Sequence, residues 1–125
     1  MILKKGSDLL LTEQDGNRLE HPEIQLPGGG IDPGEQVIPA LHREVMEETG
    51  WVISRPVRLG AYRRFVFMPD YDLWAEKICL IYLALPIRRL GPPTEDLHTP
   101  LWVPMVDAPA LLANEGDADF VASLL

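Results

Sequence analysis

The sequence predicts an α+β fold in which a mixed β-sheet packs against helices, and we expect residues 1–125 to form a single domain. Three features predict this class. Short strand-like segments precede a helical segment that ends at Gly50, a nearly continuous apolar run is typical of a buried strand, and a further helical segment closes the chain. A chain of this length can bury one hydrophobic core without disulfides.

The segment before the helix is predicted to supply short strands. These strands are residues 1–4, 8–13 and 24–26. The run Leu9-Leu10-Leu11 predicts that the second strand is buried on both faces. Between the second and third strands we expect a turn at residues 15–17 and a polar loop as far as Pro22.

The helix is predicted to begin near Gln36 or Val37, because Pro39 is tolerated only in a first turn. It is predicted to end at Gly50. Its apolar residues recur at helical spacing and form a stripe that can dock on a sheet, with Ile38, Leu41 and Val45 as its main members.

The segment after the helix should return to the sheet. Residues 52–67 are predicted to be extended, with a break near Pro56 and Gly60, and residues 68–76 to form an aromatic-bearing loop. Residues 77–85 are predicted as the central strand, buried on both faces and ended by Pro86.

The last part of the chain is predicted to be mostly loop and helix. Residues 90–100 read as a loop and residues 101–103 as a short final strand. A helix is expected from an Asp107 cap through Ala113, and another from Asp117 or Asp119 onward.

Three carboxylates on the predicted helix share one face. Glu44, Glu47 and Glu48 fall within a sector of roughly 100°. Like charges at this spacing destabilise a helix by about 0.2–0.5 kcal/mol, and the last turn of a helix disfavours anions further. A divalent cation would turn this repulsion into attraction, so the face is a candidate metal site. Arg43 lies one turn before Glu47 and can orient that carboxylate.

A glycine-rich loop leads into this helix. Gly28, Gly29 and Gly30 let the backbone approach a ligand closely, and the turn at residues 32–34 precedes Glu35. Loop and helix together read Gly29-x5-Glu35-x7-Arg43-Glu44-Val45-x-Glu47-Glu48-x-Gly50. This stretch resembles the Nudix box, GX5EX7REUXEEXGU with U a bulky aliphatic residue, at every fixed position. The one departure is Trp51, where an aliphatic residue is usual.

The resemblance implies a three-layer α/β/α sandwich around a mixed β-sheet and a hydrolase that uses Mg²⁺ or Mn²⁺. Its substrate would be a nucleoside diphosphate linked to another moiety, X, whose pyrophosphate is attacked by water. The implied metal ligands are Glu44, Glu47, Glu48 and the backbone carbonyl of Gly28. Glu35 would support the metal cluster directly or through water, with Arg43 as an orienting partner.

The general base is not fixed by the box. Four carboxylates stay open for this role: Glu44, Glu76, Glu95 and Asp96. Glu76 is also open as an additional metal ligand. His98 could contact phosphate or transfer protons, whereas for His21 we favour an ordinary surface position.

Substrate contacts are predicted outside the box. Arg63 and Arg64 belong to a basic cluster, and an arginine fork suits phosphate oxygens. Strand alternation puts these two on opposite faces, so one substrate meets at most some of the cluster. Tyr71 could stack on a nucleobase, although the aromatic loop could equally bury its rings in a neighbouring subunit or under its own hairpin.

The composition limits which binding partners and which cellular compartment we expect for this protein. A formal net charge of −8 argues against binding to nucleic acid or to an anionic membrane. Cys79 is the single cysteine and is expected to be a buried thiol, which fits a reducing, cytoplasmic compartment. The start of the chain has no room for a signal peptide, and because the first strand begins almost at Met1, a longer natural amino terminus stays open.

Two function classes remain open. The main one is the metal-dependent hydrolase, and the alternative is a non-catalytic module of the same fold that senses a nucleotide or contacts a protein. No Gly-Lys-Ser/Thr follows the glycines, which excludes a phosphate-cradling NTPase loop. Pro33 and Gly34 interrupt the turn where a Rossmann GxGxxG would run into its helix. The sequence also allows a homodimer.

Overall fold

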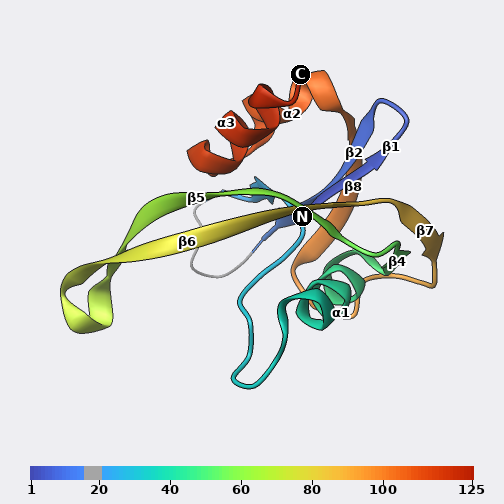
Figure 1. Ribbon diagram of the computed structural model, residues 1–125. Coiled ribbons are helices and arrows are strands. Elements are labelled where there is room, and N and C mark those ends of the chain that lie inside the picture. Colours follow the sequence, from blue (N-terminus) through green and yellow to red (C-terminus); the bar gives the residue numbers. More distant parts are fainter. Residues whose placement is uncertain (16–20) are drawn as a thin grey trace.

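A mixed β-sheet forms the centre of the computed structural model, which describes residues 1–15 and 21–125 (Figure 1). The strands are β1 (Ile2–Lys5), β2 (Asp8–Gln14), β3 (Glu23–Gln25), β4 (Trp51–Ile53), β5 (Val57–Met68), β6 (Leu73–Ala84), β7 (Pro86–Arg89) and β8 (His98–Pro104). The helices are α1 (Val37–Thr49), α2 (Ala108–Leu111) and α3 (Glu115–Ser123). Short 3₁₀ turns are present at Pro69–Tyr71 and Met105–Asp107.

Strand β2 organises the sheet. One of its edges pairs with β8 from Asp8 to Gln14, and its other edge pairs first with β1 and then with β3. Strand β1 pairs in parallel with the end of β6, and β6 pairs with β5. The described strands β3 and β6 therefore lie on the same side of β2 without pairing with each other, which leaves the sheet split between them.

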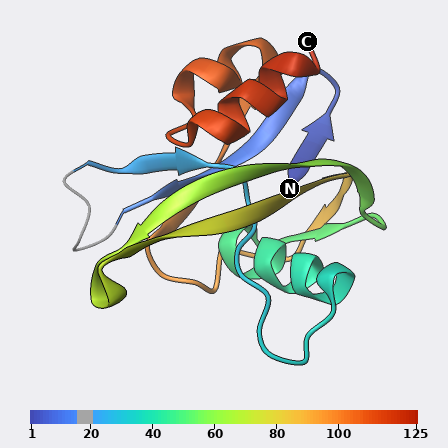
Figure 2. The same cartoon turned by 60° about the vertical axis from the view of Figure 1, so that its left-hand side comes forward.

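Two core clusters cover the two faces of the sheet. Alternation along β1 and β2 sends Ile2, Leu9 and Leu11 to the face under α2 and α3, and Leu3 and Leu10 to the face over α1. Figure 2 shows the same layers, with α1 on one side of the sheet and α2 and α3 on the other. The predicted three-layer sandwich and the burial of the leucine run are confirmed.

Helix α1 agrees with the sequence prediction at both ends. Gln36 is its extended N-cap residue, and Gly50 ends it in the left-handed conformation with φ 78°. The backbone amide of Gly50 donates to the carbonyl of Met46 at 2.9 Å, so the helix ends in a glycine cap.

The predicted loop at residues 68–76 and the burial predicted for 77–85 are wrong. Strand β6 begins at Leu73, and of its residues only Ile81 and Ala84 are buried. The reason is the shortness of β1, which pairs only with Leu83 and Ala84. Of the strands that the structure describes, β5 alone pairs with the remainder of β6, so the two strands project from the sheet as a long ribbon (Figure 1).

Several predicted ends near the carboxyl terminus are also corrected. Strand β8 is longer than predicted, and the segment that begins at Pro86 forms β7, which pairs with β4. Helix α2 ends at Leu111, well before Ala113. Asn114 caps α3 in place of the predicted aspartates, because its side-chain oxygen accepts from the amides of Gly116 and Asp117.

Two further observations complete the fold. The predicted turn at residues 15–17 and the polar loop lie largely outside the described residues. Among the described residues, no helix combines the length and the apolar character that crossing a bilayer would need.

Candidate functional site

Helix α1 holds the carboxylates at the edge of the core. Val45 and Thr49 are fully buried, and the Thr49 hydroxyl donates to the Val45 carbonyl at 2.6 Å. The helix is therefore fixed against the sheet, with Glu44, Glu47 and Glu48 beside its buried stripe.

Arg43 joins the acidic residues of the loop to those of the helix. Its guanidinium donates to both carboxylate oxygens of Glu35, at 2.7 and 2.9 Å. The Nη1 atom lies 3.0 Å from Glu44 and 3.1 Å from Glu47, and Asp32 is 3.5 Å away. The hydrogen bond from Arg43 lowers the pKa of Glu35 to about 2. One cation thus fixes the orientation of several carboxylates at once.

Glu48 is the most buried of the three helix carboxylates, with 5% of its surface exposed. Its Oε2 accepts from the backbone amide of Gly28 at 2.9 Å. Burial raises the pKa of Glu48 to about 8, against the lowering effect of that hydrogen bond, and the charges of Glu44 and Glu95 raise it further. A bound cation would favour the ionised form of this carboxyl group.

The glycine loop lies directly against Glu44. A Cβ atom at Gly29 would lie 2.8 Å from Oε2 of Glu44, so only glycine leaves this carboxylate undisturbed. Burial raises the pKa of Glu44, and the neighbouring Arg43 opposes that shift.

Glu95 lies in the loop before β8 and approaches the carboxylates of helix α1. The amides of Thr94 and Glu95 donate to the backbone carbonyl of Glu47, at 3.0 and 2.9 Å. These bonds tie the loop to the carboxyl end of α1, where helix carbonyls lack internal partners.

His98 lies behind Glu95, with 4% of its side chain exposed. Its Nε2 is 3.9 Å from oxygens of both Glu48 and Glu95, and its Nδ1 is 3.3 Å from the hydroxyl of Thr12 on β2. The register that pairs Gln14 with His98 brings this histidine to the acidic residues.

The acidic side chains form two overlapping groups. Glu44, Glu47 and Glu95 offer oxygen atoms within 4.8 Å of one another, and Glu48, Glu95 and His98 form a second such group. The three helix carboxylates therefore do not converge on one point by themselves, and Glu95 links the two groups. The carboxylate oxygens of these groups are a suitable donor set for Mg²⁺ or Mn²⁺.

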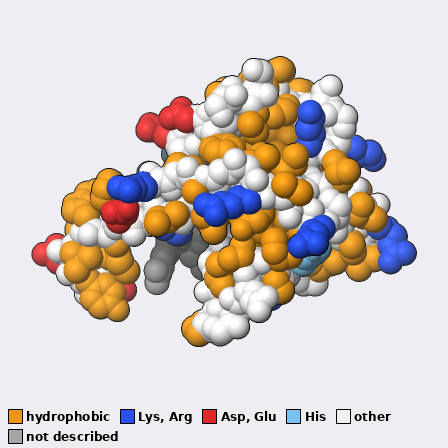
Figure 3. All heavy atoms as spheres, in the orientation of Figure 1, with side chains coloured by type: hydrophobic (Ala, Val, Ile, Leu, Met, Phe, Trp, Pro, Cys, Tyr) orange, Lys and Arg blue, Asp and Glu red, His pale blue; other side chains and the backbone are white. Residues whose placement is uncertain are grey.

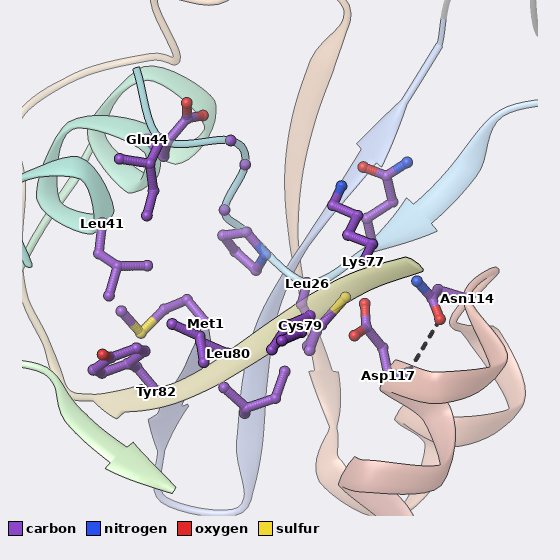
Figure 4. A pocket seen from close by; sticks show the side chains of 18 of the residues that line it. Met1, Leu26, Leu41, Glu44, Lys77, Cys79, Leu80, Tyr82, Asn114 and Asp117 are labelled. Carbon is purple, nitrogen blue, oxygen red and sulfur yellow. Dashed lines mark hydrogen bonds between the residues drawn. The ribbon is translucent and has the colours of Figure 1, made fainter. Parts of the chain in front are cut away.

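A cavity of about 640 Å³ adjoins these carboxylates at the split between β3 and β6. Figure 4 shows Glu44 and Leu41 of α1 at one end and Asn114 and Asp117 at the other, with residues of β6 between them. Glu44 thus connects the acidic groups to a space large enough for a small molecule.

Arg64 is the one predicted substrate residue that lines this cavity, together with its cross-strand partner Lys77. Arg63 points to the other face of the ribbon, as predicted, and lies 3.4 Å from Glu76. Tyr71 lies at the ribbon tip, outside the cavity lining. Glu76 is in neither acidic group of the described residues, and Asp96 and His21 are exposed.

The far wall of the cavity is held by Tyr62, which the sequence did not single out. Its hydroxyl donates to Oδ1 of Asp117 at 2.5 Å and lies 3.4 Å from Asn114, which links β5 to the start of α3. Burial and the neighbouring Asp117 raise the pKa of Tyr62. Cys79 also lines the cavity and is half-buried, which corrects the expectation of a fully buried thiol.

Comparisons with known proteins agree with this geometry. A family model described as the NUDIX domain matches residues 1–124. The relatives include the "Putative 8-oxo-dGTP diphosphatase" of Bacillus subtilis, 34% identical over 74 residues that make up 59% of this chain and 47% of that protein. They also include the nucleoside triphosphatase NudI of Escherichia fergusonii, 32% identical over 66% of this chain and 60% of that protein. The chain thus spans only about half to three fifths of these relatives.

Solved structures share the fold. A NUDIX hydrolase from Nitrosomonas europaea has a TM-score of 0.76 at 18% identity, covering 98% of this chain and 84% of that one. The MutT protein from Bacillus halodurans has a TM-score of 0.70 at 20% identity, covering 97% of this chain and 76% of that one.

Proposed function

This chain belongs to the NUDIX domain family, and on that premise we propose that it is a hydrolase that depends on a divalent metal ion. The proposed reaction cleaves the pyrophosphate linkage of a nucleoside diphosphate joined to another moiety, with water as the nucleophile. The observation that carries the proposal is the pair of acidic groups joined by Glu95, one of which includes the cavity-lining Glu44. We further propose that residues 1–125 act as one domain, and a cytoplasmic location stays a prediction from the sequence.

The proposed metal ligands are Glu44, Glu47, Glu48 and the Gly28 carbonyl, with Glu95 added. Bound there, Mg²⁺ or Mn²⁺ would neutralise charge on the pyrophosphate and lower the pKa of a water molecule. Arg43 and Glu35 would hold the carboxylates in position, because their two-pronged ion pair fixes the start of this cluster.

Glu95 is our proposed general base among the four carboxylates that the sequence left open, with one of its two oxygens on the metal ion and the other free to take a proton. Glu44 is engaged by Arg43 at 3.0 Å, and Glu76 is engaged by Arg63 on the ribbon. Glu95 belongs to both acidic groups and is exposed, so a water molecule bound there could pass its proton to it.

The substrate would lie in the cavity with its phosphates toward α1. Arg64 and Lys77 line the same cavity as Glu44, and their positive charges suit phosphate oxygens. Two relatives of this chain are named "Putative 8-oxo-dGTP diphosphatase" and "Nucleoside triphosphatase NudI", so nucleoside triphosphates are the first substrates to test.

The alternative proposal is a non-catalytic module that binds a nucleotide in the same cavity. The buried Glu48 favours the enzyme, because an acidic cluster of this kind opposes folding and has no use in a site that binds only an anion.

A hydrolysis assay separates the two proposals. We would incubate the protein with nucleoside triphosphates, nucleotide sugars, ADP-ribose and dinucleoside polyphosphates, with Mg²⁺ or Mn²⁺ and with a chelator, and measure phosphate and nucleotide release.

Glu95→Gln should lower turnover roughly 100-fold or more. Asp96→Asn is the matched control and should retain activity, because Asp96 is in neither acidic group. Nucleotide binding without turnover of any substrate would establish the alternative.

A further inference from the structure

The ribbon formed by β5 and β6 extends well beyond the rest of the sheet. The two strands pair from Val57–Leu83 to Met68–Leu73, whereas β1 reaches only Leu83 and Ala84. Figure 1 shows the ribbon projecting to one side of the molecule. Among the described strands, its far half is therefore paired only within the ribbon itself.

One face of this ribbon is largely aromatic. In an antiparallel ribbon, directly paired residues and those two positions apart lie on the same face. We call this surface the aromatic face; its residues are Arg63, Phe65, Phe67, Trp74, Glu76 and Ile78. The rings of Phe67 and Trp74 are 5.4 Å apart, which agrees with a shared face.

The aromatic face is open to solvent. Phe65 is 66% exposed, Trp74 68% and Ile78 64%. Figure 3 shows the projecting ribbon covered mainly by hydrophobic side chains. The three aromatic side chains expose on the order of 300–400 Å² of surface, which is the size of apolar patch that usually has a function.

The shape of this face fits a macromolecule better than a small ligand. Small ligands bind in concave pockets. Ile78 alone of the aromatic face lines the large cavity, and Phe65 and Trp74 stand on a projecting ribbon. A partner of matching shape would remove their apolar surface from water and gain about 25 cal/mol for each square ångström buried.

We propose that the aromatic face binds a second copy of this chain in a two-fold symmetric dimer. The proposal goes beyond the hydrolase activity and does not depend on it. A two-fold axis along the ribbon would place β5 of one copy over β6 of the other, so that Arg63 lies near the partner's Glu76 and Glu76 near the partner's Arg63. The Phe67 and Trp74 rings of the two copies would then meet on the tip side of these charge pairs, because Phe67 and Trp74 pair beyond the levels of Arg63 and Glu76.

The charge distribution supports a second copy as the occupant. Each chain carries a formal charge of −8, so most surfaces of two copies repel each other. The aromatic face holds one cation and one anion, Arg63 and Glu76, already 3.4 Å apart within one chain. It is therefore electrically neutral and self-complementary, and two copies can approach there without net repulsion.

Light scattering coupled to size-exclusion chromatography, over a range of protein concentrations, tests the proposal. The wild-type protein should run as a dimer, and Phe65→Ser and Trp74→Ser should weaken the dimer at least tenfold. Val106→Ser is the matched control, because Val106 is 71% exposed but lies in the turn before α2, away from the ribbon. All variants should keep the wild-type circular dichroism spectrum and melting temperature as monomers, because the changed side chains are exposed.

A charge exchange tests the symmetry of the contact. In the Arg63→Glu variant, two glutamates would face each other across the axis, and in the Glu76→Arg variant, two arginines would. Each variant alone should therefore be monomeric, because like charges repel. An equimolar mixture of the two variants should restore dimers, because each variant then meets its opposite charge on the other chain. Mixed chains that stay monomeric would overturn the two-fold arrangement.

Two further results would overturn the proposed dimer. A wild-type protein that stays monomeric at all concentrations would overturn the proposal, and flotation with vesicles would then show whether a bilayer is the occupant. Dimers that survive in Phe65→Ser and Trp74→Ser would place the interface elsewhere and overturn it too. Because Glu95→Gln leaves this face unchanged, its effect on turnover is separate from the effect of these variants on assembly.

Discussion

Arg43 is the residue on which the arrangement of the acidic site depends most. Its single guanidinium contacts Glu35, Glu44 and Glu47 at hydrogen-bond distance. An ammonium group has the same charge but cannot donate in one plane to several carboxylates at once. The charge of Arg43 is therefore less important for the site than its geometry.

We expect Arg43→Lys to fold normally but to lose about 10- to 100-fold in kcat, with weaker metal binding. Steady-state kinetics and a titration with Mn²⁺ measure the two effects. Arg88→Lys is the control, because Arg88 is exposed on β7 and pairs with the backbone of Val52. Equal activity in both variants would mean that Arg43 does not position the carboxylates.

Glu48 should give the metal-free protein an unusual pH dependence. Its pKa is raised from 4.5 to about 8 in the folded state, so the folded protein keeps a proton that the unfolded chain releases. The contribution of Glu48 to the free energy of unfolding should therefore be greatest below pH 4.5 and fall by up to about 1.4 kcal/mol per pH unit until pH 8.

Glu48→Gln removes this titration, and its amide oxygen can still accept from Gly28. With a chelator present, the melting temperature of the variant should rise relative to that of the wild type as the pH increases from 5 to 8. Turnover by the variant should nevertheless be strongly reduced. A large loss of metal-free stability in the variant would contradict the buried, strained position of Glu48.

At the scale of elements, the glycine loop is shaped by its contact with α1. Gly29 and Gly30 are adjacent and neither has a positive φ, yet only Gly29 lies against Glu44. A Cβ atom at Gly30 would meet nothing within 4 Å. Gly29→Ala should displace the carboxylate of Glu44 and weaken metal binding about tenfold, or ~1.4 kcal/mol. Calorimetric titration with Mn²⁺ measures this change, and Gly30→Ala should bind as the wild type does.

The carboxyl end of α1 depends on Gly50 in a different way. Gly50 has φ 78°, and a Cβ atom there would overlap the carbonyl oxygen of Gly91. Gly50→Ala should lower the free energy of unfolding by about 2–4 kcal/mol, from backbone strain and overpacking together. Gly34 has a similar φ of 81° with open space around it, so Gly34→Ala should cost only the strain, about 1–2 kcal/mol. Urea denaturation compares the two variants.

At the scale of the whole molecule, the sequence predicted best where local signals decide the structure. The start of α1 follows from Pro39 and its end from Gly50, and both agree with the structure. The burial of Leu9, Leu10 and Leu11 also followed from their pattern, because a core cluster covers each face of the sheet at β2.

The predictions failed where the structure depends on distant parts of the chain. An apolar run predicts burial, but the run around Ile78 is exposed because β1 is too short to cover it. Likewise, nothing near Glu95 or His98 in the sequence shows that the β2 and β8 register brings them to α1. Glu95 could only be kept as one of several open carboxylates until that register was known.

The bonds from the amides of Thr94 and Glu95 to the Glu47 carbonyl have a consequence for ion selectivity. Calcium prefers oxygen ligands at 2.3–2.6 Å, roughly 0.3–0.5 Å farther than magnesium does. To accommodate the larger ion, Glu95 would have to move away from Glu47, which would stretch two backbone hydrogen bonds at once. A site stiffened in this way should reject calcium by its radius, so that calcium competes poorly with Mn²⁺ even when present in excess.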